Sequence, residues 1–74
     1  MRSALQVKTE IARFLKRDVA TLGDELVLRE LVTDSFRLVE LVMTLQEELD
    51  VVVNQVDLAP VRTVGDLTQV FTAL

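Results

Sequence analysis

Apolar residues recur at every third or fourth position in three separate segments of this 74-residue chain. Because successive residues of an α-helix are about 100° apart around its axis, this spacing places the apolar side chains on one face of a helix. The three segments are residues 4–16, 35–49 and 63–74. The β-branched run Val51–Val53 has no convincing partner strand elsewhere in the sequence. We therefore expect an all-α chain that forms one domain, residues 1–74.

The first segment is expected to form an amphipathic helix from Ala4 to about Lys16, with Ser3 as its N-cap. Its apolar positions are Ala4, Val7, Ile11, Phe14 and Leu15. Arg13, Lys16 and Arg17 fall near its end, where cations complement the negative end of the helix dipole. This basic cluster is therefore explained without a binding function.

Residues 18–34 keep no single period and contain the loop formers Thr21, Gly23 and Asp24. We expect a long structured loop here, with a short helical turn at Leu28–Leu31. Loops of this length are uncommon in compact small domains, and those that occur tend to be functional.

The clearest helix is expected from Ser35 to about Leu49, with Asp34 as its N-cap. The face that would pack into the core carries Leu38, Leu41, Val42, Leu45 and Leu49. A second arc, nearly opposite, carries Phe36, Val39 and Met43, beside Glu40 and Glu47. One helix cannot point both arcs into a two-layer core. Either this helix is buried on both sides, or the second arc is an exposed apolar strip edged by carboxylates.

The last third of the chain is expected to run extended through Val51–Val53 and to form one helical turn at Val56–Ala59, ended by Pro60. Thr63–Asp66 resembles a capping box, with Asp in place of the usual Glu, and predicts the start of a final helix. The apolar face of this helix carries Val64, Leu67, Val70, Phe71 and Leu74. The expected fold is a small four-helix bundle, with three main helices, one short helix and a long first loop.

The composition excludes most enzyme mechanisms, because the chain contains no Cys and no His. It therefore lacks a thiolate nucleophile, an imidazole base and the usual ligands of a zinc site, and it cannot form disulfides. The remaining acid–base candidates are carboxylates, Lys and Arg, and no pair of them is placed in an evident pocket. We expect no catalytic residues and no resident metal.

Charge is distributed unevenly along the chain. Residues 1–17 contain five basic groups and one acidic group, a net charge of +4, whereas residues 18–74 contain eleven acidic and three basic groups, a net charge of −8. An acidic body repels nucleic acids and attracts partners with basic surfaces. The sequence shows neither a transmembrane span nor a signal peptide, so we expect a cytoplasmic monomer that binds no membrane.

Ser35 directly follows Asp34 at the start of the clearest helix, where backbone N–H groups and the helix dipole favour a bound or covalent phosphate. Taken alone, this dipeptide is more simply an N-cap and a first helical residue. Its context is more specific. Asp34–Ser35–Phe36 is followed by Val39–Met43, which reads VELVM, and by the acidic end of the helix. Together with the segment Thr63–Leu67, which reads TVGDL, this pattern resembles the acyl carrier protein family over essentially the whole chain.

The resemblance implies a carrier that is not itself an enzyme. Ser35 matches the serine that is esterified by 4′-phosphopantetheine, which a separate phosphopantetheinyl transferase takes from coenzyme A with Mg²⁺. Asp34 matches the acid of the same motif and would help to hold the transferase's metal. The thiol of the arm would carry acyl, aminoacyl or polyketide intermediates as thioesters. The family's partner-binding surface matches Phe36, Val39, Glu40, Met43 and Glu47. The implied partners are the transferase, an acyl-loading ligase or acyltransferase, and a downstream synthase or transferase.

Three departures from the family pattern favour a specialised biosynthetic pathway over housekeeping fatty-acid synthesis. Phe36 and Thr33 stand where aliphatic residues are usual. The stretch 54–59 contains one acid, Asp57, instead of an acidic cluster, and Arg62 lies close by. The alternative hypothesis is a helical adaptor that binds a partner non-covalently through Phe36, Val39 and Met43.

Overall fold

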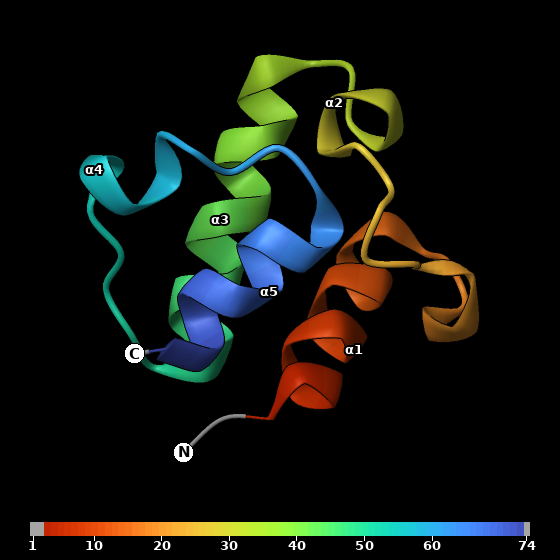
Figure 1. Ribbon diagram of the computed structural model, residues 1–74, viewed down its shortest axis with the longest axis horizontal. Coiled ribbons are helices and arrows are strands. Elements are labelled where there is room, and N and C mark those ends of the chain that lie inside the picture. The colour runs from red at the N-terminus through yellow and green to blue at the C-terminus, as the bar shows by residue number, and fades with distance from the viewer. Residues whose placement is uncertain (1–2, 74) are drawn as a thin grey trace.

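The computed structural model describes residues 3–73, and in this range the chain is helical without strands (Figure 1). The elements, in order, are α1 (Ala4–Leu15), a 3₁₀ turn (Val19–Thr21), α2 (Leu28–Leu31), α3 (Ser35–Leu49), α4 (Gln55–Leu58) and α5 (Val64–Ala73). The expected all-α bundle is confirmed. The helical turn expected in the first loop is the short helix α2, so two short helices accompany the three long ones.

The helices begin where their local sequence predicts. Ser3 caps α1, since its hydroxyl accepts from the Gln6 amide at 3.1 Å and the Gln6 side chain accepts from the Ser3 amide at 3.1 Å. Asp34 caps α3, with its Oδ1 accepting from the Phe36 amide at 2.9 Å. Both caps satisfy amides that have no partner within their own helix.

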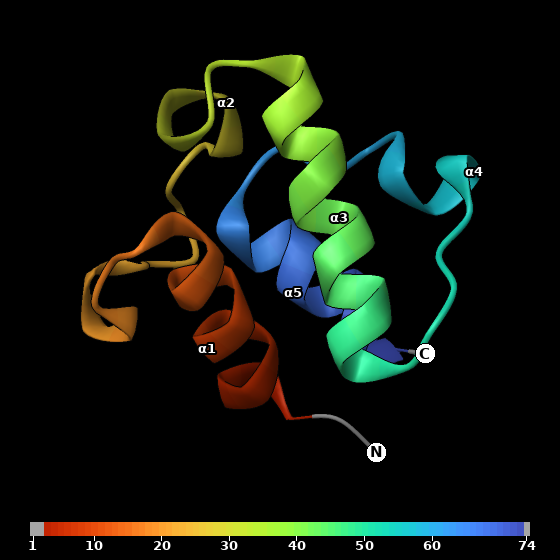
Figure 2. The same cartoon turned by 180° about the vertical axis from the view of Figure 1, so that it is seen from behind.

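The core lies among the three long helices, and α1 packs against both α3 and α5 (Figures 1 and 2). Its fully buried side chains are those of Val7, Ile11, Leu41, Leu45, Val64, Leu67 and Phe71. On the expected inner face of α3, Leu41, Leu45 and Leu49 are buried, which confirms the helical phase. Leu38 and Val42 are only half-buried, because the short helix α4 covers that side of α3 incompletely. Leu74 lies outside the described residues.

The first loop is fastened to the start of α5. The amide of Leu28 donates to the Arg62 carbonyl, the amide of Val64 to Leu26, and the amide of Gly65 to Asp24, each at 2.9 Å. Val27 and Thr63 form an isolated antiparallel bridge within this contact. The Asp24 carboxylate also pairs with Lys8 of α1. Two segments about forty residues apart in sequence are thereby held side by side.

The expected capping box of α5 is present. Thr63 Oγ1 accepts from the Asp66 amide at 3.1 Å, and Asp66 Oδ2 accepts from the amides of Thr63 at 3.1 Å and Arg62 at 3.0 Å. Because Val64 and Gly65 donate to the first loop, every amide of the first turn of α5 has an acceptor.

Gly65→Ala is expected to destabilise the fold, because a Cβ at this position would lie 2.8 Å from the Cβ of Asp24 and 3.0 Å from its carbonyl oxygen. The cost should be about 1–3 kcal/mol in the free energy of unfolding, as for other overpacked sites, measured by urea denaturation. Gly23→Ala is the matched control, because its Cβ would meet only the mobile end of the Glu25 side chain. Equal stabilities of the two variants would contradict the close approach of α5 to the loop.

Asp66→Asn is expected to reduce the pH dependence of stability. Hydrogen bonds from the amides of Arg62 and Thr63 lower the pKa of Asp66 below its ordinary value of 3.8. A carboxyl group whose pKa is lower in the folded state than in the unfolded state stabilises the fold at pH values above its unfolded-state pKa. This stabilisation is lost as the pH falls through the folded-state pKa. The wild type should be more stable than Asp66→Asn at neutral pH. This difference in the free energy of unfolding, measured by urea denaturation, should shrink below pH 3.8. A difference that does not vary with pH would refute the role of the charge.

Candidate functional site

Ser35 is the first residue of α3 and is exposed to solvent. This end of α3 lies beside α2 and points away from the N-terminal end of α1 (Figures 1 and 2). The hydroxyl of Ser35 has no hydrogen-bond partner among residues 3–73, so it is open to modification. The structure thus leaves the predicted attachment residue accessible.

The surroundings of Ser35 suit a phosphate. Asp34 uses Oδ1 to bind the Phe36 amide, which fixes the start of the helix. Within the described part of the chain, the amides of Ser35 and Arg37 have no acceptor and remain available to phosphate oxygens. These amides, and the dipole of a helix fifteen residues long, favour negative charge at this position.

A contact between α1 and α3 holds the first turn of α3 in place. The Arg37 guanidinium lies over the Phe14 ring, 4.8 Å from its centroid. Such cation–π contacts contribute about 0.5–1 kcal/mol at exposed sites. Arg37 therefore has a structural role, although it lies close to Ser35 in the sequence.

The second arc of α3 is exposed, which decides between the two alternatives left open by the sequence. Phe36 is 80% exposed, Val39 55% and Met43 53%. Glu40 and Glu47 are exposed beside them. These five residues form one surface, apolar in the middle and acidic at the edge, which begins one residue after Ser35.

A groove of about 870 Å³ opens beside this surface. Its wall on α3 consists of Leu38, Val39, Val42 and Met43, and the rest comes from residues 27–29, from α4 and the loop that follows it, and from Leu67 of α5. The α3 residues lie three, four, seven and eight positions after Ser35, so they share its side of the helix. The groove therefore opens on the same side of α3 as Ser35.

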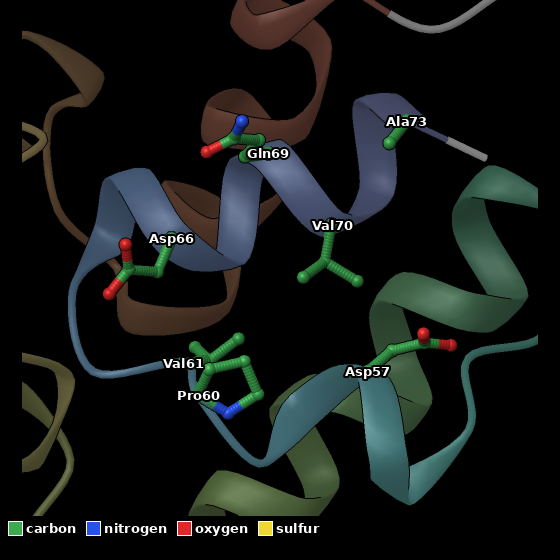
Figure 3. A pocket seen from close by; sticks show the side chains of 7 residues that line it. All are labelled: Asp57, Pro60, Val61, Asp66, Gln69, Val70 and Ala73. Carbon is green, nitrogen blue, oxygen red and sulfur yellow. The ribbon is translucent and has the colours of Figure 1, made fainter.

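A second cavity, of about 410 Å³, lies between α4 and α5 (Figure 3). Val61 and Val70 point into the space between the two segments. Its two carboxylates are used as helix caps, with Asp57 accepting from the Asn54 amide at 3.3 Å and Asp66 accepting from the Thr63 amide at 3.1 Å. Each of these two acids therefore has one oxygen engaged in capping a helix.

Comparison with known proteins explains this arrangement. Residues 6–71 match the family model described as a phosphopantetheine attachment site. The chain belongs to this family of carrier domains. A comparison with curated proteins found no match.

Family membership establishes the cofactor. Domains of this family are the sites at which 4′-phosphopantetheine is covalently attached. The exposed hydroxyl of Ser35, the free amides beside it and the groove along α3 fit a phosphate ester that continues into a long arm. The bound arm supplies a thiol, which a chain without Cys otherwise lacks. In general, such carriers are not catalysts and work with modifying transferases and synthases.

None of the described helices combines the length and the apolar character that crossing a bilayer requires.

The groove was not predicted from the sequence, because it depends on the pairing of residues 24–28 with residues 62–65. Arg29 and Arg62, which line it, were missed as a pair. One signal was present: only three basic residues follow residue 17, and these are two of them.

Proposed function

We propose that the chain carries acyl, aminoacyl or polyketide intermediates as thioesters on a 4′-phosphopantetheine arm attached to Ser35. The observation that carries this proposal is that Ser35 is the only serine within the residues that match the family model, 6–71. Its exposure at the start of a long helix supports the same assignment. The chain itself catalyses no reaction and presents its cargo to separate enzymes.

In the modification step, the Ser35 oxygen forms a bond to the β-phosphorus of coenzyme A and loses its proton to the transferase. The bond from that phosphorus to the bridging oxygen breaks, and adenosine 3′,5′-bisphosphate leaves. Asp34 keeps the helix start in place through the Phe36 amide at 2.9 Å. Its other carboxylate oxygen is left for the Mg²⁺ ion of the transferase. The amides of Ser35 and Arg37 stabilise the charge of the phosphodiester that results.

The apolar surface of α3 is proposed to bind the partner enzymes: the transferase, an acyl-loading ligase or acyltransferase, and a downstream synthase or transferase. Phe36, Val39 and Met43 supply contact area, while Glu40 and Glu47 steer basic partners toward it. The surface is small, so each complex is short-lived. A carrier that visits several enzymes in turn needs this property.

A specialised biosynthetic pathway is favoured over housekeeping fatty-acid synthesis. The stretch 54–59 contains one acid, Asp57, which is half-buried and accepts from the Asn54 amide through Oδ2, so α4 presents little negative charge to a partner. Arg62, exposed in the next loop, makes that side of the molecule less negative. Partners of this chain are expected to approach along α3 instead of along α4.

Ser35→Ala is expected to abolish modification. The wild-type protein, incubated with coenzyme A, Mg²⁺ and a broad-specificity phosphopantetheinyl transferase, should gain one phosphopantetheinyl group by intact mass spectrometry. Ser35→Ala should gain none, and Ser3→Ala, which changes the other serine of the chain, should be modified like the wild type. Modification of Ser35→Ala would overturn the site.

Phe36→Ala is expected to weaken partner recognition without affecting the fold. Because Phe36 is 80% exposed, its truncation should change the free energy of unfolding by no more than about 0.5 kcal/mol. The loss of a central apolar contact should lower kcat/KM of the transferase about tenfold. Leu5→Ala removes an exposed apolar side chain from α1 and serves as the control, with kcat/KM unchanged. Equal kcat/KM for both variants would refute this docking surface.

A further inference from the structure

The groove beside Ser35 is positively charged although the surrounding chain is acidic. Residues 18–74 contain eleven acidic and three basic groups. Two of the three basic groups, Arg29 and Arg62, line the groove, and none of the eleven carboxylates does. The other polar groups that line it, Gln55 and Thr63, are uncharged. The sign of the groove is therefore opposite to that of the body in which it lies.

The contact between the first loop and the start of α5 brings together the backbone segments that carry the two arginines. Arg29 follows Leu28, whose amide donates to the carbonyl of Arg62 at 2.9 Å. Neither guanidinium forms an ion pair within residues 3–73. The acid closest to Arg62 in the sequence, Asp66, lines the neighbouring cavity, and its Oδ2 already accepts two amides. After the hydrogen bonds from the Arg62 and Thr63 amides, the charge of Arg62 also lowers the pKa of Asp66, so this carboxylate is near Arg62 without forming an ion pair with it.

The remaining wall of the groove is apolar. It includes Leu38 and Val42 of α3, Leu58 of α4 and Leu67 of α5. Leu38 and Val42 begin one turn after Ser35 on the same side of the helix, so an arm on Ser35 would bring its cargo to this wall. A ligand that matches the groove has an apolar body and a negative end.

We propose that this groove binds a thioester cargo whose acyl chain ends in a carboxylate, with the chain against the apolar wall and the carboxylate paired with Arg29 and Arg62. Guanidinium groups recognise carboxylates through paired, charge-assisted hydrogen bonds. A methyl-ended chain would fill the apolar wall and leave both arginines unpaired, and an amine-ended chain would be repelled. The assignment rests on the proposed function, because the cargo reaches the groove from Ser35.

The test compares two cargoes of equal length. The apo protein is loaded by a broad-specificity transferase with either adipoyl-coenzyme A or hexanoyl-coenzyme A, which differ only in a terminal carboxylate or methyl group. Intact mass is read first. Failure of either compound to load onto Ser35 would overturn the proposed function itself. The melting temperature of each loaded protein is then measured by circular dichroism at low ionic strength.

The adipoyl form of the wild type is expected to melt at least about 4 °C above the hexanoyl form. The double variant Arg29→Gln/Arg62→Gln should load equally well and lose this difference, whereas Arg29→Lys/Arg62→Lys should keep part of it. Arg17→Gln is the control, because it removes one exposed positive charge that does not line the groove, and it should keep the full difference.

Equal melting temperatures of the two loaded wild-type forms would overturn the proposal while leaving the carrier function intact. A difference that survives in the glutamine double variant would overturn the assignment to these arginines. The phosphate of the arm is a second negative group that could bind the arginines, and the holo protein without cargo tests for this binding. If the shift between the apo and holo forms is lost in the double variant and the cargo makes no further difference, the arginines bind that phosphate and the proposal is wrong.

Discussion

The hydrogen bonds between the first loop and the start of α5 are the constraint on which the rest of the structure depends. They satisfy the amides of Val64 and Gly65, which a helix cannot satisfy by itself, with carbonyl groups of Leu26 and Asp24. Asp24 also pairs with Lys8, so one loop residue joins α1 and α5. Together with the buried side chains of Leu22, Leu28 and Val32, this contact fixes the course of the first loop and the place of α2.

The helix α3 serves stability and function with different faces. Leu41, Leu45 and Leu49 are buried and hold the helix to the bundle, whereas Phe36, Val39 and Met43 leave more than half of their side chains exposed to solvent. Exposed apolar side chains are unfavourable in water, and their spacing places them together next to Ser35. Between these faces, Leu38 and Val42 are half-buried and form the groove. A single helix therefore provides part of the core, an exposed apolar surface and one wall of the groove.

The sequence predicts best those features that depend on neighbouring residues. The caps at Ser3, Asp34 and Thr63 were correctly predicted, because each involves atoms within three residues of one another. The same local pattern predicted that Ser35 is the first residue of α3. The groove was not predictable, because the segments that carry Arg29 and Arg62 are joined only by a long-range backbone contact. The burial of Leu38 and Val42 was overestimated, because periodicity indicates which side of a helix faces inward and not how completely a neighbour covers it.

The short helix α4 has a consequence for the width of the groove. None of its four residues is buried, and Val56 is 82% exposed, so little apolar burial holds this segment in place. Segments with few buried contacts open locally at a lower free energy than the core. The two sides of the groove thus differ, because α3 is anchored by three buried leucines and α4 by no buried residue. An outward shift of α4 would therefore widen the groove at a lower cost in free energy than any movement of the three long helices, whose packing forms the core.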